Sequence, residues 1–259
     1  MNSRANVVSS FTVIKGALID ETFTVLRAWD LGASKAENLR RMRAENWIGA
    51  ASANWSRDVA WVLSRRLDPA GRDRPLVALA KAGAGPDLFR PALLWHMTRD
   101  EFLVRDFLVT WLYPRYADGA FRLRTEDMLP YLAGLAERGV AVAAAWSALT
   151  AARVAAGLLR MAVDFGLMTG SMVREFASYH LSDEAFLYIA HALAEQEPSA
   201  SRLLAAPDWR MYLMDAGDVE RELLRLHQFQ RLDYQAAGSL AQLALPCPSL
   251  AAYVEGLAR

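Results

Sequence analysis

Residues 34–67, SKAENLRRMRAENWIGAASANWSRDVAWVLSRRL, predict two consecutive helices and set the fold class of the chain. The run Ser34-Lys35-Ala36-Glu37 has the form of a capping box, in which the serine hydroxyl accepts a hydrogen bond from the backbone N–H of Glu37. A helix from Lys35 to about Trp47 follows. Helical spacing of apolar residues recurs along most of the chain, so we expect a mainly α, multi-helical fold.

The second helix of this stretch follows a short turn at 48–51 that contains Gly49. Ser52 or Asn54 can cap it, and it runs to about Leu67. Two helices joined by a short turn have the outline of a helix-turn-helix, whose second helix lies in a DNA groove.

The same stretch is basic, with seven Lys and Arg side chains against three Asp and Glu, a local excess of four. Helical periodicity separates most of these charges from the apolar faces. The expected DNA contacts are Lys35, Arg40, Arg41, Arg43, Arg57, Ser64, Arg65 and Arg66. Trp61 shares the outward face and is expected to bind a partner. The alternative is an ordinary solvated arginine face with Trp61 buried by another helix.

A second candidate surface lies between Trp146 and Leu181. Its helix carries Arg153 and Arg160 on one stripe with Gly157 and Asp164, and a turn and a short hairpin with Arg174 follow. This order of elements is that of a winged helix, in which the helix enters the major groove and the hairpin touches the backbone. The alternative is that Asp164 pairs with Arg160 one turn away and neutralises the stripe.

The other helices are expected from their periodicity and caps, at 16–29, 75–82, 87–96, 98–112, 125–137, 183–195, 199–205, 208–214, 219–229 and 250–257. Thr98 to Glu101 reads as a capping box, and Ser182 as a cap. Residues 232–243 predict a second short hairpin. The segment 113–119 breaks the pattern and divides the chain into a helix-turn-helix-like part, 1–115, and a winged-helix-like part, 116–259.

No sequence motif for catalysis is present. The chain has neither a Walker nor a Rossmann glycine spacing, no GxSxG motif, and no two of its four histidines at the spacing that binds zinc on one helix. Its single cysteine excludes an internal disulfide. We therefore expect a binding protein that is not an enzyme and needs no metal or other cofactor.

The charge and hydropathy patterns limit where the protein acts and which of its surfaces could bind DNA. The apolar stretch 139–168 contains Arg153, Arg160 and Asp164, so we expect a buried or amphipathic helix and no membrane span. With no secretory signal, the predicted location is the cytoplasm. The 29 basic and 29 acidic residues cancel overall, but residues 183–233 hold ten acids and five arginines and should face away from nucleic acid.

Short runs spread over nearly the whole chain resemble the BrxA family of the bacterial BREX phage-exclusion system. They are Phe11-Thr12, Gly16-Ala17-Leu18 with Glu21, Glu45-Asn46, 52–57, 63–67, Arg105-Asp106-Phe107, 146–150, 164–167, Asp208-Trp209-Arg210 and 234–238.

This resemblance implies a small, largely helical, DNA-binding protein without enzymatic activity, whose N-terminal part is similar to the antitermination factor NusB. It also implies partners: double-stranded DNA, and the methyltransferase, ATPase and phosphatase-like components of the BREX system. The competing hypothesis is a protein-interaction adaptor that nucleates the defence complex without binding DNA itself.

Overall fold

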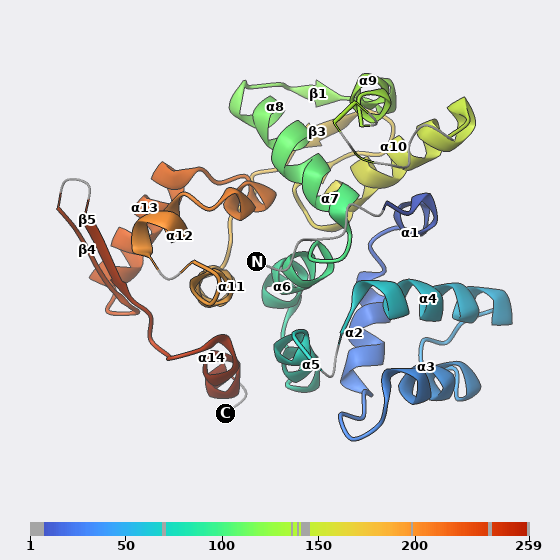
Figure 1. Cartoon of the computed structure of the whole chain (residues 1–259), viewed down its shortest axis with the longest axis horizontal. Helices are drawn as coiled ribbons and strands as arrows, with labels where there is room; N and C mark the ends of the chain where they lie inside the picture. The colour runs from blue at the N-terminus through green and yellow to red at the C-terminus, as the bar shows by residue number, and fades with distance from the viewer. Residues whose placement is uncertain are drawn as a thin grey trace.

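The computed structural model describes residues 8–68, 71–135, 137, 138, 140, 146–197, 199–237 and 240–257. It is mainly helical, with two small antiparallel sheets at its periphery (Figure 1). The predicted fold class is thereby confirmed. The likeness to NusB stays a prediction.

The N-terminal helices form in the predicted places, and α1 (Ser10–Lys15) is an additional helix that the sequence did not predict. They are α1 (Ser10–Lys15), α2 (Ile19–Arg27), α3 (Lys35–Ala44), α4 (Ala53–Arg66), α5 (Arg74–Lys81) and α6 (Pro86–Met97). The hydroxyls of Ser34 and Ser52 accept from the backbone N–H groups of Glu37 and Trp55, at 3.1 and 3.2 Å, as N-caps do. Residues 16–18 form no helix, so the helix expected over 16–29 begins only at Ile19.

A longer helical run follows, formed by α7 (Phe102–Asp106), the π-helical turn η1 (Phe107–Leu112) and α8 (Tyr113–Ala117). Two expectations are wrong here. Thr98 does not cap a helix, because its hydroxyl donates to the carbonyl oxygens of Leu94 and Trp95. The segment 113–119 is helical as far as Ala117, so no backbone break occurs there. The division into two parts stays a prediction, although its boundary falls inside α8.

The middle of the chain contains the predicted helix, turn and short hairpin, preceded by other short elements. It comprises β1 (Arg122–Leu123), η2 (Thr125–Met128), α9 (Leu129–Ala133), α10 (Ala148–Asp164), β2 (Met168–Thr169) and β3 (Arg174–Phe176). The strands pair in the order β1-β3-β2, with Leu123 opposite Arg174. Gly170, at φ 92°, makes the turn because a side chain there would meet the carbonyl of Val173.

The C-terminal part packs its helices against α5 and α6. Its elements are α11 (Asp183–Ala194), α12 (Ala200–Leu204), η4 (Pro207–Tyr212), α13 (Ala216–Gln228), β4 (Asp233–Ala237), β5 (Leu240–Ala244) and α14 (Leu250–Leu257). Ser182 caps α11, and β4 and β5 form the expected second hairpin at one edge of the molecule (Figure 1).

A buried chain of polar side chains joins α5 and α6 to α11. His96 of α6 lies between Asp73 at the start of α5 and Tyr188 of α11, with contacts of 2.6 and 2.7 Å. All three side chains are almost fully buried. Because each polar atom in this chain has a partner, burial of the polar groups is compatible with a stable core.

A second buried network is centred on Arg66, at the end of α4. Its Nε donates to the carboxylate of Glu101 at 3.2 Å, and its other nitrogens donate to the backbone carbonyls of Thr12, Gly16 and Ala17 at 2.8–3.1 Å. The Thr12 hydroxyl donates to the second oxygen of Glu101 at 3.0 Å. Arg66 and Glu101 are 2% and 1% exposed, so the pair lies inside the core.

This network yields a stability prediction. Glu101→Gln leaves the buried guanidinium without its counter-charge and should lower the free energy of unfolding by about 3–5 kcal/mol, as should Arg66→Met. The double variant removes both charges, so we expect it to lose clearly less than the sum of the two single losses. Urea unfolding of the four proteins measures this. Additive losses would show that the two groups do not act as a pair.

Candidate nucleic-acid interface

Helix α1 lies between the two helices on which the sequence placed DNA contacts, α4 and α10, on one side of the molecule (Figure 1). Toward α4, Lys15 forms an ion pair with Asp58 at 2.7 Å, and the ring of Phe11 meets that of Trp61 edge-on at 4.9 Å. Toward α10, the backbone of Val13 packs against Gly157. The two candidate surfaces are therefore neighbours separated by one short helix.

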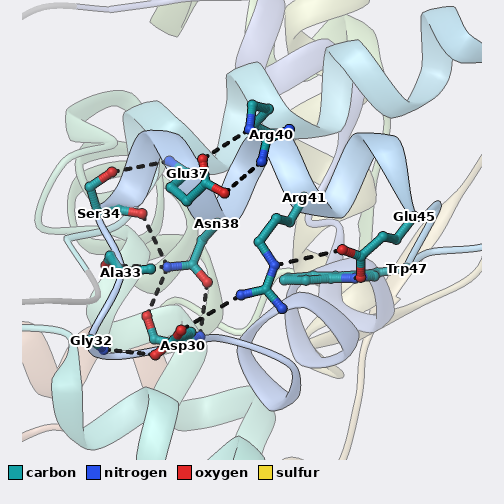
Figure 2. A network of polar contacts seen from close by, with 10 residues as sticks. All are labelled: Asp30, Gly32, Ala33, Ser34, Glu37, Asn38, Arg40, Arg41, Glu45 and Trp47. Carbon is teal, nitrogen blue, oxygen red and sulfur yellow. Dashed lines mark hydrogen bonds and ion pairs between the residues drawn. The ribbon is translucent and has the colours of Figure 1, made fainter.

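Figure 2 shows that two arginines of the α3 surface are already paired. Arg40 donates two hydrogen bonds to Glu37, at 2.6 and 2.9 Å. Arg41 lies 3.6 Å from both Asp30 and Glu45, and its guanidinium stands over the ring of Trp47. These contacts reduce the positive field that the sequence predicted for α3.

Three other predicted contacts on this surface have partners within the chain. Lys35 donates to the carbonyl oxygens of Ser64 and Leu67 at 2.9 and 3.1 Å, where it caps the end of α4. Arg57 lies 3.7 Å from Asp58 but is 61% exposed. Arg66 is buried in the network described above and has no access to a phosphate, so we remove it from the predicted contacts.

The remaining predictions on α3 and α4 stay open. Arg43 and Ser64 are exposed, and Arg65 is half-buried. Among the residues that the structure describes, Arg43 has no ion pair. Trp61 is 48% exposed, so the alternative in which another helix buries it does not hold.

The stripe on α10 is divided by its contact with α1. A Cβ at Gly157 would lie 2.8 Å from the carbonyl oxygen of Val13, so α1 covers the middle of the stripe. Arg153 and Arg160 flank this contact and are both exposed. Neither forms an ion pair with a described residue, and the expected alternative pairing of Arg160 with Asp164 is not formed.

These two arginines line a cleft of about 740 Å³. Its walls are the turn from α1 to α2 (residues 14–21), Val163 and Asp164 of α10, Trp55 of α4 and Arg90 of α6. Sequence reasoning missed Arg90, whose side chain is exposed and also lacks an ion pair with the described residues. Three arginines thus line one concave site, and each could bind a phosphate.

Asp164 lies within this cleft and interacts electrostatically with Arg160, although the two side chains form no ion pair. Burial raises the pKa of the Asp164 carboxyl, while the charge of Arg160, a backbone N–H of Ala17 and the charge of Arg90 act in the opposite direction. The Ala17 N–H links the carboxylate to the turn between α1 and α2. Its charge still reduces the positive potential of the cleft.

Arg174, the hairpin residue predicted to touch the DNA backbone, is only 7% exposed. Its Nε and Nη1 are buried, and within the described part of the chain they have no hydrogen-bond partner. Burial accordingly lowers its pKa. A guanidinium in this state would gain from an external anion, but the prediction that it contacts DNA stays a prediction.

Membrane-spanning helices and metal clusters are absent from the part of the chain that the structure describes. No helix there combines the length and the apolar composition needed to cross a bilayer. The described residues also contain no group of three or more His, Cys, Asp or Glu arranged to hold a metal ion.

The contact of α1 with α10 yields a prediction. Gly157→Ala forces the backbone of Val13 away and should lower the free energy of unfolding by about 1–3 kcal/mol. Gly256→Ala is the matched control: it is also helical and has open space around it, so we expect no loss and a gain of up to about 1 kcal/mol. Thermal and urea unfolding measure both. An equal response of the two variants would contradict the close packing at Gly157.

Comparison with known proteins agrees with the predicted family. The family model of BrxA matches residues 9–192, which is more than half of the chain and extends from α1 into α11. A comparison with curated proteins gives no match. On the strength of the family match, the chain belongs to the BrxA family.

Proposed function

We propose that this protein is a non-enzymatic component of a BREX phage-defence system that binds double-stranded DNA through contacts of arginines with phosphates. Membership of the BrxA family supports the association with BREX. The observation that carries the DNA-binding part is the cleft in which Arg90, Arg153 and Arg160 meet without ion pairs to the described residues. Among the described residues no carboxylate forms an ion pair with them, so they can bind an external anion although Asp164, Asp20 and Glu21 line the same cleft.

The arrangement around the cleft favours nucleic acid over an isolated small anion. Arg153 and Arg160 lie on α10, the helix for which the sequence predicts the DNA-contacting role of a winged helix. The hairpin that follows α10 carries Arg174. Phosphate contacts along a helix and an adjacent hairpin would fix the protein on the DNA backbone without reading its sequence.

The charges of the acidic C-terminal part also support an orientation in which the α10 side of the molecule faces DNA. Arg221 pairs with Asp218, and Arg225 with Asp183 and Glu222, so these two arginines already have carboxylate partners. The basic side of the molecule would therefore face DNA, while this part faces solvent or protein components of the system.

A protein-interaction adaptor is the second candidate, favoured by Trp61. This ring is 48% exposed and is held edge-on by Phe11, as an anchor for a partner would be. The BREX methyltransferase, ATPase and phosphatase-like protein are the partners to test.

The proposal predicts a specific change in salt dependence. The double variant Arg153→Ala/Arg160→Ala removes up to two phosphate contacts, so the slope of log affinity against log salt for a duplex should fall by up to about 1.8. Affinity should also fall by at least about tenfold at low salt. Fluorescence anisotropy with a labelled duplex measures both quantities.

The control is Arg202→Ala/Arg221→Ala, which removes two exposed, acid-paired arginines from the C-terminal part and should leave the slope unchanged. Arg40→Ala/Arg41→Ala tests the α3 surface in the same assay. A duplex affinity that the α10 variant does not alter would contradict the proposal. If that variant also still co-purified with the other BREX components, the adaptor function would be favoured.

A further inference from the structure

The cleft that contains Arg90, Arg153 and Arg160 is too small for a double helix. Its volume of about 740 Å³ lies within the range of about 300–1,000 Å³ typical of small-ligand sites. The major groove of B-DNA alone is about 12 Å wide, and the whole duplex is wider. A duplex lying on α10 could thus touch the rim of the cleft, but only a single strand could enter it.

The charges in the cleft suit a nucleotide better than a bare anion. The three arginines come from two helices, α6 and α10, and all of them line the cleft. Asp20 and Glu21, in the first turn of α2, line the same space. Their carboxylates would repel a phosphate, but they can accept hydrogen bonds from the amino groups of an unpaired base.

Aromatic rings extend from the cleft toward the outer face of α4. Trp55 lines the cleft, and the amine of Lys15 lies 5.5 Å from its ring and 5.1 Å from that of Phe11. Phe11 in turn contacts Trp61. Aromatic rings that alternate with basic groups are the usual means by which proteins hold single strands, since every base has a face that can stack.

We propose that this cleft binds an unpaired DNA strand, such as the overhang at a duplex end, with its phosphates on Arg90 and Arg160 and a base beside Trp55. The inference rests on the proposed function, because it assigns the same arginines to phosphates. It adds that the DNA strand bound inside the cleft is unpaired. Arg90 and Trp55 then act as residues that select the form of DNA.

The test compares three labelled DNAs with the full chain by fluorescence anisotropy: a blunt duplex, the same duplex with an overhang of about six nucleotides, and the single strand alone. We expect the overhang to bind at least about tenfold more tightly than the blunt duplex, since one stacked base can supply that factor. Arg90→Gln and Trp55→Leu should each reduce this preference severalfold or more. Arg202→Gln, an exposed arginine on α12, is the control and should keep it.

The outcomes separate this inference from the proposed function. Equal affinity for blunt and overhanging duplexes, or a preference that survives both Arg90→Gln and Trp55→Leu, would overturn the inference while DNA binding itself stands. Absence of binding to any of the three DNAs would overturn both. Because Arg90 is exposed, Arg90→Gln should keep the thermal stability of the parent protein, and its result remains decisive even where Trp55→Leu is destabilised.

Discussion

The buried guanidinium of Arg66 holds three distant parts of the chain in one place. It joins the end of α4 to Glu101 before α7, and to the backbone carbonyls of residues 12, 16 and 17. Those carbonyls belong to the end of α1 and the turn that follows it. Because Arg66 takes them as acceptors, the chain at residues 16–18 is fixed outside any helix, and this turn becomes one wall of the cleft.

The position of α1 has two consequences for binding. It brings the arginines of α10 next to the aromatic rings of α4, and its contact with Gly157 covers the middle of the α10 stripe. The winged-helix-like helix therefore does not present an uninterrupted face to DNA. Its free arginines lie on either side of α1 and beside a cleft, which favours contacts with phosphates over the reading of bases in a groove.

Local features of the fold were predictable from sequence, while the composition of the site was not. Ser34, Ser52 and Ser182 cap the helices predicted for them, because a cap depends on residues three positions away. Arg66 was predicted as a DNA contact because helical periodicity does not reveal which helices pack on α4. Arg90 was missed because it lies on a third helix, far along the chain from Arg153 and Arg160.

The runs that resemble BrxA are dispersed in sequence but meet in space. Thr12, Gly16 and Ala17 contact Arg66, the N–H of Ala17 contacts Asp164, and Arg105 forms two hydrogen bonds of 2.9 Å with Asp208. Part of the resemblance thus coincides with contacts that fix α1 and one wall of the cleft.

Hydrogen–deuterium exchange of the full chain, with and without DNA that carries an unpaired end, tests most directly whether the cleft is the binding site. The account predicts slower exchange of backbone amides in residues 14–21 and in the half of α10 from Arg153 onward when DNA is bound. Exchange in α13 should not change. Protection confined to α3, with the cleft segments unaffected, would contradict the account.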